Sequence, residues 1–290
     1  MIAYITWNPD RVAFTIPYFI FDIYWYSIFF AIGFYGAIVI ARYLIKARAK
    51  SFSTFDQAQI DSYIDWLTFY CFIGVIVGAR LGHVLFYDLA HHLAQPLDIF
   101  NLRLGGLASH GGIIGLLIAL WFFSKKKGYT APYFPRRYDL FDLLSVASAW
   151  LAGCIRIGNF FNQEIVGLQT TVPWAVRFIS PLDASGGIPR HPTQLYEAFV
   201  AFSLLILLLF ITRGKKWATG GRLTGWYLLL TFSFRYLIEQ YKVPQCTFDA
   251  HAMHMGQLLS IPLILIALYL IFRPHVAKSK EQSEHHHESR

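Results

Sequence analysis

The stretch Leu104–Phe123, LGGLASHGGIIGLLIALWFF, contains no Lys, Arg, Asp or Glu. A helix needs about 20 mostly apolar residues to cross the hydrocarbon core of a bilayer, and this stretch has that length. A second stretch without formal charge, Met253–Phe272, reads MHMGQLLSIPLILIALYLIF. Two such stretches predict an integral membrane protein.

The composition supports the same conclusion. Hydrophobic residues make up 56% of the chain and charged residues only 14%, whereas soluble domains carry about 25% charged residues. The net charge of +8 might suggest nucleic-acid binding. The basic residues, however, form short clusters between apolar runs and no continuous patch, so we expect no nucleic-acid partner.

Five further apolar runs have the length of a membrane span. They cover Phe19–Ala41, Tyr63–Phe86, Leu140–Phe161, Thr193–Thr212 and Leu223–Tyr241. The expected fold is therefore an all-α integral membrane protein with about seven transmembrane helices. We expect residues 1–277 to form one membrane domain and the polar residues 278–290 to form a disordered tail.

The positions of the basic residues predict the orientation. Of the 25 Lys and Arg, 17 lie in the segments that follow odd-numbered spans, five lie on the other side, and three lie within spans. Because Lys and Arg concentrate in cytoplasmic loops, the N-terminus is expected outside and the C-terminus in the cytoplasm.

A small cap is expected on the outer side, over about residues 163–192. Within it, Thr171–Ile179 alternates between apolar and other residues and predicts a short strand. Asp183–Pro189 contains two consecutive glycines and predicts a turn. We predict no metal site, since nothing fixes the geometry of His285–His287 and the three cysteines lack C-x-x-C spacing.

Charged residues inside membrane helices are costly and therefore mark function. Arg80, Arg156 and Arg235 all lie late in spans that run from inside to outside, which places them in the outer half of the bilayer. Polar residues early in the opposite spans reach the same level: Tyr26, His110, His191, Glu197 and His254. The sequence thus predicts one polar site in the outer leaflet.

Simpler roles stay open for several of these residues. Arg235 and Glu239 are spaced as an intrahelical ion pair. Arg80 could extend to the headgroups, and Tyr26 could belong to an interfacial aromatic belt. The glycines beside His110 could serve close helix packing.

A lipid phosphodiester is the natural ligand for such a site. Arginine presents a planar fork of donors that matches phosphate oxygens, and histidine can move a proton at neutral pH. These arguments reach a phospholipid-handling protein and do not name a reaction. A transporter and a non-catalytic lipid-binding scaffold remain as alternatives. A transporter predicts internal repeats, which we do not find, and a scaffold has no use for His110.

The stretch Arg156–Gly167, RIGNFFNQEIVG, narrows the choice. It resembles the signature R-x-G-N-F-x-N-x-E-x-x-G of the bacterial prolipoprotein diacylglyceryl transferases. Three further matches support the resemblance: His110-Gly111-Gly112, the run RHPTQLYE at 190–197, and the Arg235–Glu239 segment. The chain departs from the family pattern at Ile155, usually Gly, and Thr193, often Ser.

The resemblance implies a seven-helix membrane enzyme of the bacterial inner membrane that needs no cofactor. Its partners would be phosphatidylglycerol and a prolipoprotein whose signal peptide ends in a lipobox cysteine. The enzyme would transfer the diacylglyceryl group to the cysteine thiol and release glycerol phosphate. This is the first step of bacterial lipoprotein maturation.

The resemblance also implies roles for individual residues. Arg156 and Arg235 would stabilise charge on the leaving phosphate, and His110 is the candidate base, although it could instead contact the headgroup. The implied catalytic residues are His110, Arg156, Arg235 and Tyr26. The implied substrate-binding residues are Arg156, Asn159, Asn162, Glu164, Gly167, Glu239, Arg80 and His191.

Overall fold

The computed structural model describes residues 4–17, 21–50, 56–86, 88–101, 108–125, 137–213, 220–244 and 253–273. The predicted tail 278–290, with His285–His287, lies outside the described residues. So does the start of the charge-free stretch Leu104–Phe123, up to residue 107.

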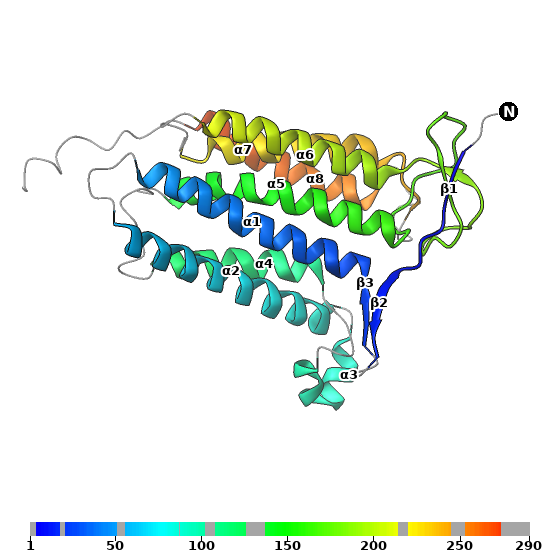
Figure 1. Ribbon diagram of the computed structural model, residues 1–290, viewed down its shortest axis with the longest axis horizontal. Coiled ribbons are helices and arrows are strands. Elements are labelled where there is room, and N and C mark those ends of the chain that lie inside the picture. The colour runs from blue at the N-terminus through cyan, green and yellow to red at the C-terminus, as the bar shows by residue number, and fades with distance from the viewer. Residues whose placement is uncertain are drawn as a thin grey trace, which may run out of the picture.

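Seven long helices form a bundle in the described part of the chain (Figure 1). They are α1 (Trp25–Ala49), α2 (Gln57–Phe86), α4 (Ser109–Lys125), α5 (Arg137–Phe161), α6 (Thr193–Thr212), α7 (Arg222–Glu239) and α8 (Met255–Phe272). Each overlaps one predicted span, and α6 has the predicted bounds. The largest difference is at α1, which begins at Trp25 because the preceding residues form a strand, and which runs on to Ala49, well past the predicted end at Ala41.

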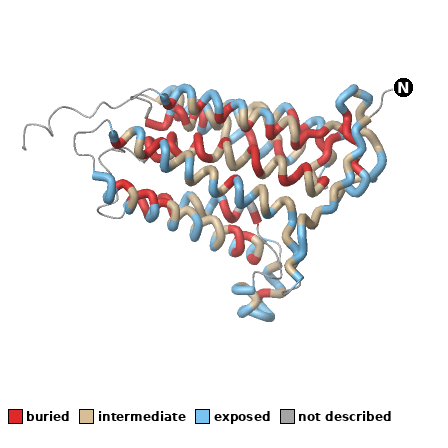
Figure 2. The backbone as a smooth tube through the Cα atoms, in the orientation of Figure 1, coloured by how far each residue is buried: buried red, intermediate tan, exposed pale blue. Residues whose placement is uncertain are grey.

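The bundle is that of a multi-pass membrane protein. Helices α1, α2, α5, α6 and α8 are long and apolar enough to cross a bilayer. Helix α4 is shorter, and α7 carries Arg222, Arg235 and Glu239. Large apolar side chains point outward from the bundle, as on α6, where Phe199, Ile206 and Phe210 are mostly exposed. Figure 2 shows this exposed outer surface around a buried interior. Lipid is the solvent that such a surface requires.

Helix α5 contacts three neighbours and so organises the bundle. It packs against α1, α6 and α7, while α2 pairs with α4 and α7 with α8. The main buried cluster includes Leu143 and Val146 from α5, Ile64 from α2 and Leu208 from α6. The far end of α5 therefore has a fixed position relative to α6 and α7.

Glycines bring α2 and α4 into backbone contact. A Cβ atom placed on Gly78 would meet the carbonyl oxygen of Gly111, and one on Gly115 would meet that of Gly74. Such close approach is typical of membrane helices, where small residues allow efficient packing. Gly111, next to His110, thus serves helix packing, as one sequence interpretation proposed.

A small β-structure covers one end of the bundle. Strand β1 (Ile5–Trp7) pairs in parallel with β4 (Val176–Phe178), and β4 pairs antiparallel with β5 (Pro189–Arg190). A separate hairpin, β2 (Val12–Ile16) with β3 (Phe21–Tyr24), leads into α1. Strands β1 to β3 were not predicted from the sequence, since short strands with exposed apolar residues lack a clear alternating pattern.

The predicted strand Thr171–Ile179 is shorter than expected. Only Val176–Phe178 is extended, because a turn closed by Ala175 N–H and Val172 O (3.0 Å) precedes it. Trp174 is mostly exposed instead of lying beside the buried Val176. The predicted turn is confirmed at Gly187, where φ is +77° and the N–H donates to Phe178 O at 2.7 Å.

A short arm follows α2 and was also missed by sequence reasoning. It consists of helix α3 (Leu89–Ala94) and the 3₁₀ turn η1 (Pro96–Phe100). Arg80 of α2 is buried and donates to the carbonyl oxygens of Ile99 (2.9 Å) and Asp98 (2.5 Å). Arg80 thus holds the arm against the end of α2.

Candidate active site

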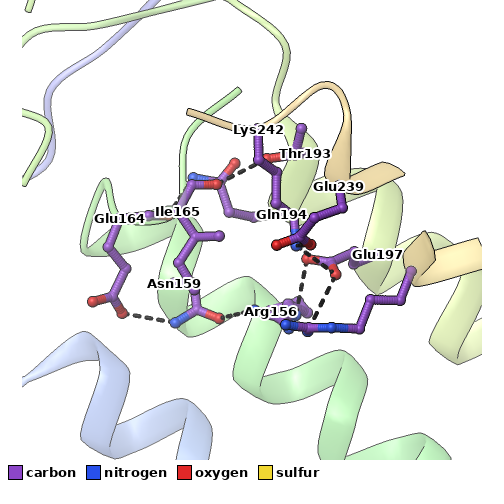
Figure 3. A network of polar contacts seen from close by, with 10 residues as sticks. Arg156, Asn159, Glu164, Ile165, Thr193, Gln194, Glu197, Glu239 and Lys242 are labelled. Atoms are coloured by element: carbon purple, nitrogen blue, oxygen red, sulfur yellow. Dashed lines mark hydrogen bonds and ion pairs between the residues drawn. The ribbon is translucent and has the colours of Figure 1, made fainter. Parts of the chain in front are cut away.

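The polar site begins on the last two turns of α5. Arg156 and Asn159 are three residues apart, so both project from one face of the helix. Arg156 Nη1 donates to Asn159 Oδ1 at 3.1 Å, and Asn159 Nδ2 donates to Glu164 Oε1 at 2.7 Å (Figure 3). Asn162 Nδ2 reaches the same Glu164 oxygen at 3.5 Å. The signature residues therefore orient one another.

Glu197, in the first turns of α6, links these hydrogen-bonded side chains to Arg235 of α7 and to Lys242, which follows α7. Its Oε2 lies 3.1 Å from Arg156 Nε, an ion pair aligned too poorly for a hydrogen bond. Its Oε1 accepts from Lys242 Nζ at 3.0 Å and lies 3.9 Å from Arg235 Nη1 of α7. One buried carboxylate is thus shared by three cations.

A second carboxylate, Glu239, sits at the end of α7. Its Oε2 accepts from Lys242 Nζ at 3.0 Å. A Cβ atom on Gly256 of α8 would meet the Glu239 carboxyl group, so glycine at that position makes room for the charge. The intrahelical Arg235–Glu239 pair considered from sequence gives way to pairing of Arg235 with Glu197 and of Glu239 with Lys242.

Both arginines keep donors that no described protein group uses. Arg156 directs Nε to Glu197 and Nη1 to Asn159, which leaves its Nη2 without a hydrogen-bond partner among the described residues. Arg235 makes only its 3.9 Å ion pair within the same part of the chain. Their side chains are 19% and 30% exposed. Guanidinium donors at a partly open, otherwise buried site are suited to bind an oxyanion.

The loop after α5 is held in an unusual backbone conformation. Gln163 and Ile165 have φ values of 54° and 58°, a region that is costly for non-glycine residues and most of all for β-branched ones. Gln194 Nε2 donates to Glu164 O at 2.7 Å, and Thr193 Oγ1 donates to Ile165 O at 2.8 Å. The start of α6 thereby stabilises the strained loop, a pattern that is found at functional sites.

Two titratable groups in the cap are shifted by burial. Asp183 accepts from Ile165 N–H at 2.7 Å, and desolvation raises the pKa of its carboxyl group. Desolvation lowers the pKa of His191, whose Nδ1 lies 3.2 Å from Tyr196 Oη. Both shifts favour the neutral form.

Comparison with known proteins identifies the family. The family model "Prolipoprotein diacylglyceryl transferase" matches residues 11–273, nearly the whole chain. This chain belongs to the prolipoprotein diacylglyceryl transferase family. The resemblance inferred from the sequence is confirmed.

Individual family members are similar over most of their length. A protein named phosphatidylglycerol–prolipoprotein diacylglyceryl transferase from Porphyromonas gingivalis is 38% identical, covering 93% of this chain and 95% of its own. A protein of the same name from Tolumonas auensis is 37% identical over 91% and 95%. A third, from Solidesulfovibrio magneticus, is 37% identical over 87% and 90%.

The structure brings together most of the residues that the family resemblance singled out. Direct contacts place six of them in one network: Arg156, Asn159, Asn162, Glu164, Arg235 and Glu239. Tyr26 of α1 packs against Gly158 and lies near enough to Glu164 and Arg156 to interact with both charges.

Other predicted residues lie elsewhere. Arg80 contacts the arm after α2 instead of the α5–α6 network. Gly167 meets the His191 backbone, where a Cβ would clash, so its contact is one of packing. His254 caps α8. The backbone of His110 lies in the first turn of α4, and its side chain lies outside the described residues.

Sequence reasoning missed two members of the network, Gln194 and Lys242, and placed a third, Glu197, at the level of the site without a role. Glu197 was noted only as a polar residue, while Gln194 and Lys242 received no role. Gln194 and Glu197 lie in the RHPTQLYE run, which offered a signal. Lys242 comes three residues after Glu239, but it resembled an ordinary basic residue just beyond a membrane span.

Proposed function

We propose that this family member transfers the diacylglyceryl group of phosphatidylglycerol to the thiol of a lipobox cysteine in a prolipoprotein. The two arginines with unused donors, Arg156 and Arg235, are the observation that carries the proposal. They come from different helices and share Glu197 between them. A phosphodiester bound there would contact both guanidinium groups.

In the proposed step, a thiolate sulfur attacks the glycerol carbon that carries the phosphodiester. A carbon–sulfur bond forms, the carbon–oxygen bond breaks, and glycerol phosphate leaves with the bonding electrons. Negative charge on the phosphate therefore grows in the transition state. Fixed guanidinium donors in a site of low dielectric constant stabilise that charge strongly.

The thiol proton needs an acceptor, because a free cysteine has a pKa near 8.5. His110 is the proposed base. Asn159, Asn162 and Glu164 would orient Arg156 and the headgroup, and Glu239 would help to place Arg235 through the shared ion pairs. Tyr26 and His191 would line the substrate site from α1 and the cap, Gly167 would shape it, and Arg80 would hold the adjoining arm.

The proposal includes an orientation in the inner membrane. The N-terminus and the cap at about residues 163–192 would face the periplasm, and the tail 278–290 would face the cytoplasm. The distribution of Lys and Arg supports this arrangement. It would bring the site to the leaflet where a prolipoprotein exposes its lipobox. Labelling of single cysteines introduced into the cap and the tail from either side of the membrane would test it.

The reaction is tested with the full chain in phosphatidylglycerol vesicles and a lipobox peptide. Mass spectrometry should find one diacylglyceryl group added to the peptide cysteine, and none on a matched peptide with serine in its place. Phosphatidylcholine vesicles are the lipid control. Failure of the phosphatidylglycerol sample to yield the adduct would refute the proposed reaction.

A further inference from the structure

Lys242 is a charged residue that the reaction described above does not use. It follows α7, and only 3% of its surface is exposed. Burying an ammonium group is costly unless close partners compensate. Burial lowers the pKa of Lys242, and the nearby Arg156 and Arg235 also lower it, while Glu197 and Glu239 oppose the shift. The cost of burying Lys242 indicates that its charge has a role at this position.

The contacts of Lys242 place it inside the network. Its Nζ lies 3.0 Å from Glu197 Oε1 and 3.0 Å from Glu239 Oε2 (Figure 3). Arg156 is nearly as close to Glu197, at 3.1 Å, whereas Lys242 is the cation paired with Glu239 among the described residues. Lys242 thus ties α6 to the end of α7 through charge.

The backbone around Lys242 is fixed to the end of the signature segment. Leu168 N–H donates to Tyr241 O at 2.7 Å, and Val243 N–H donates to Val166 O at 3.1 Å. Between these bonds, Lys242 and Gly167 face each other as an antiparallel bridge. The ammonium group is therefore positioned by the same loop that follows Arg156 and Asn159.

The charge of Lys242 changes the electrostatic balance around the two arginines. Without Lys242, the ion-paired set holds two arginines and two carboxylates, and Glu197, which contacts both arginines, competes with an incoming anion for the guanidinium donors. With Lys242, the set has three cations against two carboxylates. Glu164, held by Asn159 and Asn162, adds a third carboxylate to the wider network. Without Lys242 that network would carry a net negative charge, which disfavours a phosphodiester.

We infer that Lys242 is a positioning residue for diacylglyceryl transfer. Its charge offsets the Glu197 and Glu239 carboxylates. Glu197 contacts both arginines and, without Lys242, would hold them more strongly away from the lipid phosphate. This inference rests on the proposed function. It adds a residue that touches the arginines' partners and does not touch the reacting atoms.

Three variants test the inference in the vesicle assay: K242M, K242R and the double variant E239Q/K242M. K242M should lower kcat/KM for phosphatidylglycerol by about 10- to 100-fold, the effect of losing a hydrogen bond between charged groups. KM for the peptide should change little. K242R keeps the charge and should recover most of the loss.

The double variant separates charge from packing. E239Q removes one carboxylate and restores the surplus of one cation, so E239Q/K242M should be more active than K242M alone by about tenfold. If Lys242 only stabilised the fold, the double variant should be less active than K242M, since a second substitution in the same cluster would lower activity further. Thermal unfolding of each variant checks that the fold is retained.

Lys46 provides a matched control. Its Nζ lies 2.9 Å from Asp61 in an exposed pair between α1 and α2, so K46M should leave transfer unchanged. The wild-type protein in the same assay reports on the proposed function itself. If wild type transfers lipid while K242M matches it, or while E239Q/K242M or K242R is no better than K242M, Lys242 has no positioning role.

Discussion

The two ends of helix α5 bury charge in opposite ways. At its beginning, Asp142 is fully buried, and both carboxylate oxygens accept hydrogen bonds from the start of α7: Gly221 N–H, Thr224 N–H and Thr224 Oγ1, each at 2.9 Å. At its far end, Arg156 contacts Asn159 of the same helix and Glu197 of α6, and leaves donors unused.

The difference separates a structural anchor from the candidate active site. Asp142 acts as a cap for α7, whose own cap residue, Gly221, has no side chain to offer. Near Arg156, by contrast, buried Asn162 Oδ1 and Gln194 Oε1 have no hydrogen-bond partner in the described part of the chain. Buried polar groups are normally satisfied, and exceptions concentrate where a ligand or chemistry is involved.

The largest effect is expected at the far end of α5. R156A should lower the rate of diacylglyceryl transfer by about 100- to 1000-fold, because one donor to the developing phosphate charge is lost. R156K retains charge without the planar fork and should fall between R156A and wild type. The peptide-adduct assay measures both variants. Near-normal turnover of R156A would show that Arg156 takes no part in the reaction. The two ends of α5 would then not differ in function.

Substitution of Asp142, the structural anchor, should lower the stability of the protein and leave the rate of transfer unchanged. D142A leaves three donors at the start of α7 without their acceptor, which should lower the free energy of unfolding by about 3 kcal/mol. Turnover per folded molecule should stay at the wild-type level. Thermal unfolding in detergent and the transfer assay, run on the same sample, measure the two quantities. A loss of turnover at unchanged stability would mean that this end also takes part in catalysis.

Asn159 should show an intermediate effect. N159A removes the acceptor for Arg156 and the donor to Glu164, so transfer should slow by about 10- to 100-fold. Stability should change less than in D142A, since Asn159 makes two side-chain hydrogen bonds and Asp142 accepts three from the start of α7. Initial rates over a range of phosphatidylglycerol concentrations measure the loss. If N159A unfolds as readily as D142A and its folded fraction turns over normally, the signature asparagine is an anchor too.

The smallest effect is expected from His191. Burial lowers its pKa, so the folded protein takes up this proton less readily than the unfolded chain. The contribution to stability is present above the unfolded-state pKa, about 6.5, and is lost as the pH falls below it. Between pH 7.5 and 5.5, wild type should therefore lose roughly a few degrees more of melting temperature than H191Q. Equal losses would show that acid does not act on the cap through His191.

Local sequence patterns predicted much of the fold. Helix α6 has the bounds Thr193–Thr212 expected from its apolar run alone, because in a bilayer the length of an apolar run nearly dictates a helix. The signature from Arg156 to Gly167 identified the family for a similar reason. Its polar side chains are close together in the sequence and contact one another directly.

The sequence by itself therefore determined the class of protein and the family, and it pointed to the arginines that the proposed site uses. Only the tertiary structure decided that Glu197 pairs with Lys242, 45 positions away in the chain, that Arg80 turns to the arm after α2, and that β1 pairs with β4. Hydropathy and motif spacing report on neighbours along the chain. Pairing of distant charges depends on how helices pack and on which buried groups must be neutralised, and neither is written in any single segment.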